Sequence, residues 1–482
     1  MDDLLSSKAH VDCPPFKKSV TTSGNKVTIP AACGLPPRCC STGDSIGRNF
    51  VNHDADRLST LLQRSSVSQA SSATPGVAMP PMPAMAPMAP MPPGMPPMPA
   101  MAPMAPAPSV MPGVPTSSPP VAPPAQSPSV TIPDRPGTSL NTLEFVVTLG
   151  FGTPARPSAV LFDTGSDLSW IQCLPCSGHC YNQHDPLFDP SKSSTYSAVS
   201  CSDPQCSATG NRQCNGTTCL YDVEYGDTSS SFGILSREML TLTSSRSLPG
   251  FVFGCGQQNL GRFGEVDGLI GLGRGKLSLS SQAATSFGAT FSYCLPSHDN
   301  TPGYLNIGST PVSSKVQYTA MIQKQEYPSF YFVELVSIDI GGYVLPVPPT
   351  VFTSTGTLLD SGTILTYLPT EAYTALRDRF KFTMKGYKPA PPYDILDTCY
   401  DFTGQSSIIA PAVSFKFSDG AVFHLDFFGV MVFPEQPTMG CLAFVSRPSA
   451  MPFTIVGNIQ QRSTEVIYDV AAEKIGFVPA SC

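Results

Sequence analysis

The sequence predicts a mostly β, or all-β, fold for the part of the chain that follows Leu143. Short stretches of strand length recur there, separated by Gly, Pro, Asn and Ser, the residues that turns prefer. Only Glu371–Met384 shows clear helical periodicity, with Ala372, Leu376 and Phe380 on one face. The strand candidates are Glu144–Leu149, Ala159–Phe162, Leu220–Glu224, Phe251–Gly254, Phe330–Val336, Val422–Leu425 and Glu465–Tyr468.

Length and charge limit the possible classes of function. The 482 residues suffice for two substantial cores, and only 13% of them are charged. The net charge of −7 and the lack of a basic stretch argue against nucleic acid as a partner. Residues 1–140 hold 9 Lys and Arg against 7 Asp and Glu, and the remainder holds 19 against 28, so a weakly basic leader precedes an acidic body. No apolar run approaches the roughly 18 residues that a membrane span needs.

The first 140 residues differ in composition from the rest. Residues 1–73 are polar and irregular, with one short helical candidate at Asp56–Gln63, and we interpret them as a leader. Pro, Met and Ala dominate residues 74–140, where the nonapeptide Met82–Pro90 recurs at Met98–Pro106. Proline lacks an N–H and restricts the residue before it, so we expect an extended linker without a packed core. A Pro-rich ligand for a recognition domain is the alternative.

The cysteines predict disulfide bonds. Four of the sixteen lie before residue 41, and an even twelve lie between Cys173 and Cys482, which suggests six disulfides and an oxidising compartment. A zinc cluster around Cys173 and Cys176 is the alternative, with His179 and Cys180 as further ligands. No second pair repeats this spacing, so we predict no metal.

The sequence gives conflicting signals about export. The sequon at Asn215 predicts a glycosylation site and fits secretion. The first residues, Met1–Leu5, lack the basic and then apolar pattern of a signal peptide. Either the true N-terminus is missing from this chain, or export follows another route. We expect the secretory pathway, the extracellular space (apoplast) or the vacuole, with a plastid as a further possibility.

Two short motifs repeat across the body. Leu161–Ser166 and Leu358–Thr363 each have two apolar residues, an Asp, a hydroxyl residue, a Gly and a second hydroxyl residue. An apolar-apolar-Gly triplet follows each, Leu269–Gly271 after 107 residues (163 to 270) and Ile455–Gly457 after 96 (360 to 456). A single Asp-Thr-Gly is more often a turn or a helix cap, but two copies with matched triplets predict a functional pair.

The repeated residue types suit a pair of catalytic carboxyl groups, Asp163 and Asp360. Two carboxylates held face to face cannot both ionise, so they share one proton and titrate as a pair. The ionised member can take a proton from water that attacks an amide carbon, and the protonated member can donate one. This dyad logic is that of aspartic proteases in general. No cofactor is needed.

The neighbouring residues would support the pair. Gly165 and Gly362 permit backbone conformations that a side chain would forbid. We expect Thr164 and Ser361 to lie between the two loops and brace them. Ser166 and Thr363 would each bond the outer oxygen of their own Asp.

Over Leu143–Cys482 the chain resembles the pepsin-like aspartic proteases, and most closely their plant nepenthesin-type subgroup. The residues that carry this resemblance are Asp163–Trp170, Cys173-x-x-Cys176, Asp189–Thr195, Phe253–Gly256, Phe291–Cys294 and Asp360–Thr363. The resemblance implies a bilobal all-β fold with the Asp pair at the floor of a cleft. We place the N-terminal lobe at residues 141–325 and the C-terminal lobe at 326–482, and the leader would correspond to a propeptide, as in a zymogen.

The resemblance also implies a hairpin flap over the cleft, with Tyr225 near its tip. Trp170, the only tryptophan, would offer its indole N–H to the Tyr225 hydroxyl; core packing is the alternative role for Trp170 alone. The family pattern expects Gly where Thr228 stands, and a β-branched residue there stiffens the turn. The disulfide pairs implied by the family pattern are Cys173–Cys176, Cys180–Cys255, Cys201–Cys219, Cys206–Cys214, Cys294–Cys482 and Cys399–Cys441.

We therefore expect a monomeric aspartic endopeptidase that hydrolyses proteins or peptides at acidic pH. The alternative from another class is a catalytically silent homologue that binds a partner protein, although such chains typically lose part of one Asp motif and both are intact here. A Pro-rich structural wall protein would account for residues 74–136 alone.

Overall fold

The computed structural model describes residues 22–23 and 26–28 and residues 128–482 apart from 211, 227, 298–300, 310–312, 435–437 and 450. The chain divides into two units, Met1–Ser68 with Ser127–Cys482, and Gln69–Gln126. All the described residues belong to the first unit. The predicted helix at Asp56–Gln63 and the cysteines before residue 41 lie outside them, as does the repeated nonapeptide.

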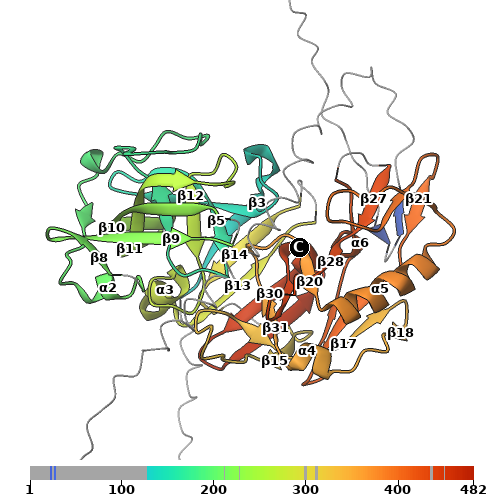
Figure 1. The fold of residues 1–482 in the computed structure, drawn as a ribbon. Coiled ribbons are helices and arrows are strands. Elements are labelled where there is room, and N and C mark those ends of the chain that lie inside the picture. Colours follow the sequence, from blue (N-terminus) through green and yellow to red (C-terminus); the bar gives the residue numbers. More distant parts are fainter. Residues whose placement is uncertain are drawn as a thin grey trace, which may run out of the picture. The chain divides into compact units, whose positions relative to one another are not determined.

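The described chain is mostly β with two lobes and few, short helices, so the predicted fold class is confirmed (Figure 1). All seven predicted strands overlap observed ones, although β16 and β17 divide the candidate at Phe330–Val336. The predicted helix is observed as α5 (Thr370–Thr383), which buries Ala372, Leu376 and Phe380. The other helices, all short, are α2 (Pro204–Ser207), α3 (Leu279–Phe287), α4 (Thr350–Thr353), α6 (Phe427–Val430) and α7 (Asn458–Gln461), with 3-10 turns at Gly137–Leu140 and Pro190–Lys192.

One large sheet contains fifteen strands and follows the order β15-β31-β30-β13-β14-β3-β4-β5-β12-β6-β11-β10-β9-β8, with β7 paired to β10. Its strands that are early in the sequence are β3 (Val130–Pro136), β4 (Phe145–Phe151), β5 (Arg156–Asp163), β6 (Trp170–Gln172), β7 (Ser197–Ala198), β8 (Gln213–Asn215), β9 (Thr218–Glu224), β10 (Ser230–Thr243), β11 (Arg246–Leu260) and β12 (Gly268–Gly271). The rest are β13 (Thr290–Cys294), β14 (Gly303–Ile307), β15 (Gln317–Ala320), β30 (Thr464–Asp469) and β31 (Lys474–Pro479). The end of the chain thus returns to β13, as Figure 1 shows for β30 and β31.

Three smaller sheets complete the C-terminal part. The first has the order β16 (Phe332–Val333), β19 (Thr357–Leu359), β29 (Thr454–Val456), β20 (Thr366–Leu368) and β28 (Phe444–Ser446). The second has the order β18 (Tyr343–Val344), β17 (Leu335–Ile340), β24 (Val413–Phe417) and β25 (Val422–His424). The third has the order β21 (Lys388–Ala390), β22 (Cys399–Asp401), β27 (Met439–Leu442) and β26 (Met431–Val432).

Two segments differ from the sequence prediction. β3 lies within the predicted linker, whose end at residue 140 was therefore placed too late. Its burial alternates, with Val130 and Ile132 inside and Pro133 exposed, so its prolines did not prevent strand pairing. In the leader, which we expected to be irregular, β1 (Thr22–Ser23) and β2 (Lys26–Thr28) form a hairpin, and β2 pairs with β23 (Ser407–Ile409). The predicted lobe boundary at 325 and 326 stays a prediction.

The buried apolar side chains of the described residues form three clusters. One surrounds Trp170 and Tyr221, another surrounds Leu358 and Ile455, and the largest includes aromatic residues of the long sheet such as Phe291. In the part of the chain that the structure describes, no helix combines the length and the apolar character that crossing a membrane would require.

Candidate functional site

The two repeated motifs follow two buried strands. Asp163 is the last residue of β5, and Asp360 comes directly after β19. The apolar pair before each Asp is buried, and both Asp residues are themselves only 1% exposed. Each apolar pair therefore delivers its carboxyl group to the interior, as the motif predicts.

The triplet strands lie beside the motif strands. β12 pairs in parallel with β5, which places Gly271 opposite Asp163, and β29 pairs in parallel with β19. A Cβ atom on Gly271 would lie 2.3 Å from the Asp167 carbonyl oxygen, and one on Gly457 would lie 2.4 Å from that of Leu365. Both triplets therefore need glycine, because the loop after each Asp crosses there at close range.

Reciprocal hydrogen bonds join the two loops. The amide of Thr164 donates to Ser361 Oγ (3.0 Å), and the amide of Ser361 donates to Thr164 Oγ1 (2.9 Å). Each hydroxyl also donates across, Thr164 to the Leu359 carbonyl (3.3 Å) and Ser361 to the Phe162 carbonyl (3.1 Å). These two residues lie between the loops, and all four bonds are buried.

The two carboxyl groups lie close together. The amide of Gly165 donates to Asp163 Oδ1 (2.9 Å), and the amide of Gly362 donates to Asp360 Oδ1 (3.0 Å). A Cβ atom on Gly165 would lie 2.8 Å from Asp360 Oδ1 and 3.2 Å from Asp163 Oδ1. The two oxygens are therefore at most 6.0 Å apart (2.8 plus 3.2), and glycine leaves the space between them open.

The second hydroxyls of the two motifs differ. Thr363 Oγ1 donates to Asp360 Oδ2, which is the bond expected of it. The matching expectation for Ser166 is wrong, because its buried Oγ has no hydrogen-bond partner among the described residues. A threonine hydroxyl is held by its β-branch, whereas a serine hydroxyl rotates more freely about χ1, so the motif letters did not fix its direction.

Helix α7 supplies contacts that the motif analysis missed. Asn458 Nδ2 donates to the Ser361 carbonyl (3.2 Å), and Gln461 Nε2 donates to the Asp360 carbonyl (3.2 Å). Both side chains are completely buried. Their signal in the sequence is a polar stretch directly after the apolar triplet Ile455–Gly457, because buried amides need hydrogen-bond partners.

The predicted flap residues meet at the end of a hairpin. β9 and β10 pair in antiparallel register, and Tyr225 begins the turn between them, with its amide donating to the Ser229 carbonyl (2.7 Å). The hydrogen bond expected from Trp170 Nε1 to the Tyr225 hydroxyl is present at 2.7 Å. Phe263 packs against both rings, edge to face with Trp170 at a centroid distance of 4.9 Å.

Thr228 lies in the left-handed backbone region of this turn, with φ +63°. A β-branched residue is an outlier there, because its Cβ substituents crowd the backbone. The substitution of Thr for the Gly that the family pattern expects therefore adds strain at the tip of the hairpin, in addition to restricting χ1.

All twelve body cysteines are in disulfide bonds, but only two predicted pairs are correct, Cys294–Cys482 and Cys399–Cys441. The other four bonds are Cys173–Cys255, Cys176–Cys180, Cys201–Cys214 and Cys206–Cys219. The first correction follows from the sheet, since the pairing of β6 with β11 places the Cα atoms of Cys173 and Cys255 5.3 Å apart. The sulfur atoms of the zinc alternative are thus already bonded.

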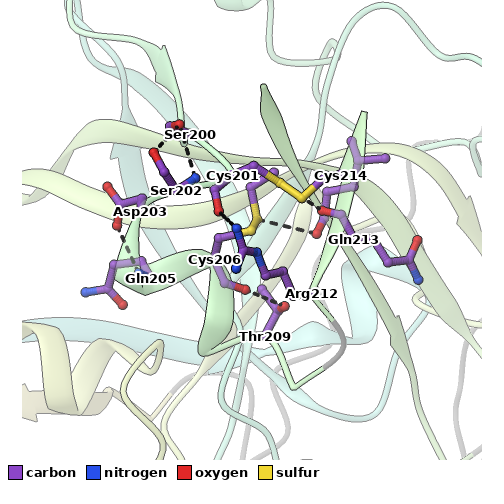
Figure 2. The surroundings of a disulfide bond; sticks show 12 residues. Ser200, Cys201, Ser202, Asp203, Gln205, Cys206, Thr209, Arg212, Gln213 and Cys214 are labelled. Atoms are coloured by element: carbon purple, nitrogen blue, oxygen red, sulfur yellow. Dashed lines mark hydrogen bonds between the residues drawn. A yellow bond between two sulfur atoms is a disulfide. The ribbon is translucent and has the colours of Figure 1, made fainter. Parts of the chain in front are cut away.

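The second pair of corrections concerns cysteines that crowd together. Cys214 and Cys219 face each other in the β8–β9 hairpin. The sulfur atoms of Cys201, Cys206 and Cys214 lie within 4.8 Å of one another, and Figure 2 shows the sulfur of Cys206 beside the bond that joins the other two. Cys201 and Cys206 could exchange their partners, Cys214 and Cys219, with only small movements of the chain. The spacing of the cysteines along the sequence therefore could not decide between the two pairings. Asn215 is exposed at the end of the same hairpin.

A cavity of about 220 Å³ opens elsewhere, between α5 and β28. Tyr367, Tyr373 and Asp397 are among its lining residues, and none of the predicted site residues is. The Tyr373 hydroxyl donates to Asp397, whose other oxygen lies 3.4 Å from Arg377. Its main polar groups therefore already have partners, and the Asp pair remains the candidate site.

Comparison with known proteins gives two family models that match the chain in succession. The model described as "Xylanase inhibitor N-terminal" matches residues 145–309, and the one described as "Xylanase inhibitor C-terminal" matches residues 330–479. Together they cover 165 plus 150 residues, or 315 of the 482.

Several plant proteins are similar to the chain in sequence. Aspartyl protease AED1 of Arabidopsis thaliana is 42% identical over 354 residues, which are 73% of this chain and 75% of that protein. Aspartic proteinases nepenthesin-1 and nepenthesin-2 of Nepenthes gracilis are each 35% identical over 350 residues, 70% of this chain and 78% of theirs.

Solved structures are similar in fold. The protein titled edgp matches with a TM-score of 0.61 at 21% identity, over 74% of this chain and 96% of that one. Basic 7S globulin from soybean matches with a TM-score of 0.59, also at 21% identity, over 74% of this chain and 97% of that one.

Proposed function

This chain belongs to the pepsin-like aspartic protease family of plants, and we propose that it is an aspartic endopeptidase whose catalytic residues are Asp163 and Asp360. The observation that carries the proposal is the pairing of the two loops. Thr164 and Ser361 make four buried hydrogen bonds across them, two with each other and two with backbone carbonyls of the opposite loop, and the two Oδ1 atoms both lie within 3.2 Å of the Cβ position on Gly165.

In the proposed reaction the two carboxyl groups share one proton. The ionised member takes a proton from a water molecule, whose oxygen attacks the carbon of the scissile amide. The protonated member donates to the carbonyl oxygen, which gives a tetrahedral gem-diol. As the C–N bond breaks, the carboxyl group that took the proton from water delivers it to the nitrogen, and the other carboxylate takes the proton of one hydroxyl, which releases the amine and the carboxylic acid. Acidic pH favours this reaction because it populates the singly protonated pair. The Thr363 hydroxyl would keep Asp360 in one rotamer throughout.

The substrate class follows from the same proposal. A protein or peptide segment would bind in extended form and place one amide beside the pair, under the β9–β10 hairpin. Trp170 would hold Tyr225 in place through the hydrogen bond that joins them. We further propose a glycosylated, secreted monomer in the apoplast or vacuole, with Asn215 as the acceptor and the leader as a propeptide of a zymogen. The six disulfides among the described residues fit an oxidising compartment.

The test is an acid-pH protease assay on the protein with the variants Asp163→Asn and Asp360→Asn. We expect each variant to lose at least about a thousandfold in kcat/KM, because one amide cannot replace either a proton acceptor or a proton donor of the pair. Asp378→Asn, which changes an exposed carboxylate on α5, is the matched control. Cleavage by either dyad variant at the parent rate would reject the proposal.

A second function rests on the name of the matching family models, which are described as xylanase inhibitor domains. In this alternative the chain is a catalytically silent homologue that binds a partner protein. The two functions differ in the same assay, since a silent homologue would leave protein substrates intact and bind its partner equally well with or without Asp163 and Asp360. Two complete Asp motifs favour the peptidase.

A further inference from the structure

Two tyrosines of the long sheet lie next to the Asp loops. Tyr293 on β13 and Tyr468 on β30 belong to neighbouring antiparallel strands and are both completely buried. Their hydroxyl oxygens are 3.0 Å apart. Neither residue belongs to the repeated motifs.

Aromatic packing holds both rings in place. Tyr468 stacks on Phe291, with centroids 4.5 Å apart and planes 5° from parallel. Tyr293 packs against Phe162, the residue before Asp163, at a centroid distance of 5.7 Å. The rings cannot turn away without opening a cavity, so the positions of the two hydroxyls are set by the core.

Gln461 connects this pair to the second loop. Its Oε1 accepts from the Tyr293 hydroxyl, while its Nε2 donates to the carbonyls of Asp360 (3.2 Å) and Val456 (2.9 Å). Both amide hydrogens and the oxygen have partners, so the side chain has one orientation. The backbone at Asp360 is thereby tied to a hydroxyl from a different sheet.

Phe162 connects the pair to the first loop, because the Tyr293 ring packs against it and its carbonyl accepts the hydrogen bond from Ser361 Oγ. Burial raises the pKa of both phenols above their usual value. The phenols thus stay protonated and able to donate at any pH at which the enzyme would work. One buried group of side chains therefore contacts Phe162, which precedes Asp163, and the backbone carbonyl of Asp360.

We propose that Tyr293, Gln461 and Tyr468 form a positioning unit that sets the separation of the two Asp carboxyl groups. The inference rests on the proposed function, because the separation matters only if the pair shares a proton. The three residues act through Phe162 and the Asp360 backbone and are positioning residues. Through these contacts the long sheet holds the two Asp loops in place, in addition to the four hydrogen bonds between the loops.

The predicted signature is in the pH profile. Two interacting carboxyl groups titrate in two steps, and the gap between the two apparent pKa values grows as the groups are held closer. If the positioning unit is weakened, the gap between the two apparent pKa values narrows. The acidic and the basic limb of the plot of kcat/KM against pH then move toward each other. A residue with only a structural role would lower the melting temperature without moving the limbs.

The experiment measures kcat, KM and the pH profile of kcat/KM for Tyr293→Phe and Tyr468→Phe. Each change deletes one hydroxyl and keeps the ring, and the second variant serves if the first fails to fold. Tyr373→Phe is the control, because it also deletes a largely buried hydroxyl, one that donates to Asp397 and contacts neither Asp loop. The limb positions do not depend on the fraction of active protein.

We expect kcat to fall about tenfold in both variants with little change in KM, as misplacement of reacting groups does. Each limb should move inward by about half a pH unit, while Tyr373→Phe keeps the parent profile. If Tyr293→Phe and Tyr468→Phe keep the pH profile of the parent enzyme, while the parent cleaves protein and Asp163→Asn does not, this inference alone is overturned. A parent without Asp163-dependent cleavage would overturn the proposed function, and the inference with it.

Discussion

The close approach of the two Asp carboxyl groups depends on the absence of a side chain at Gly165. Gly165 has no side chain, and the atom that any other residue would add falls between Asp163 and Asp360. The two loops can approach only because this space is empty. Thr164 and Ser361 then hold the approach with hydroxyls that both donate and accept. The geometry of this site therefore requires a glycine at position 165 as well as the two carboxyl groups.

Gly165→Ala should therefore lower the activity sharply. Its Cβ would lie 2.8 Å from Asp360 Oδ1, so the carboxyl groups must move apart, and we expect kcat/KM to fall at least about a hundredfold. The matched control is Gly386→Ala, where a Cβ would meet no atom within 4 Å and activity should not change. Kinetics of both variants at acidic pH would check this. An active Gly165→Ala enzyme would mean that the two carboxyl groups do not need this approach.

The turn of the β9–β10 hairpin combines packed aromatic residues at its start with a strained residue at its tip. Trp170, Tyr225 and Phe263 pack together where the turn begins. Thr228 at the tip occupies a backbone conformation that glycine adopts freely. The strain makes the observed turn less stable relative to other conformations of the same segment, so it favours transient opening of the hairpin.

Thr228→Gly should stabilise the turn by about 1 kcal/mol, because it removes the left-handed penalty at φ +63°. Hydrogen exchange of the Tyr225 amide, which donates to Ser229 in the turn, should slow about fivefold. Thr228→Val, which keeps the β-branch, should show no such gain. Equal exchange in the glycine and valine variants would mean that the turn carries no strain at this residue.

At the scale of the whole molecule, a buried carboxyl group outside the Asp pair makes stability depend on pH. Asp267, just before β12, is 3% exposed, and its Oδ2 accepts from the Ala159 amide (3.0 Å). Burial, helped by the charge of Asp185, raises its pKa to about 7. The folded protein thus keeps a proton there that the unfolded chain releases above about pH 4, so the contribution of Asp267 to stability is present in acid and lost as pH rises toward 7.

Asp267→Asn should therefore flatten the pH dependence of stability. Between pH 4 and pH 7.5 the free energy of unfolding of the parent should fall, relative to that of the variant, by up to about 4 kcal/mol, as the raised pKa of Asp267 implies. Urea unfolding at the two pH values measures this. The exposed Asp378→Asn should follow the parent at both. A constant difference between Asp267→Asn and the parent would contradict the assignment of the proton to Asp267.

The sequence by itself determined the local features that depend on residue type and spacing. Strand and turn patterns predicted the β fold, and the matched motifs pointed to the two loops. Both follow from the sequence because alternation, turn chemistry and repetition are properties of short segments. The match of the lone tryptophan to Tyr225 came from the resemblance to the pepsin-like family.

Only the tertiary structure decided which distant groups meet. It set the four disulfide bonds that the family pattern paired wrongly, left Ser166 without the bond that its motif suggested, and brought Tyr293, Gln461 and Tyr468 to the Asp loops. Apart from the Cys176–Cys180 bond, these contacts join segments that are separate in the sequence, and their geometry depends on strand register and close packing. Neither quantity is encoded in the order of residues within one segment.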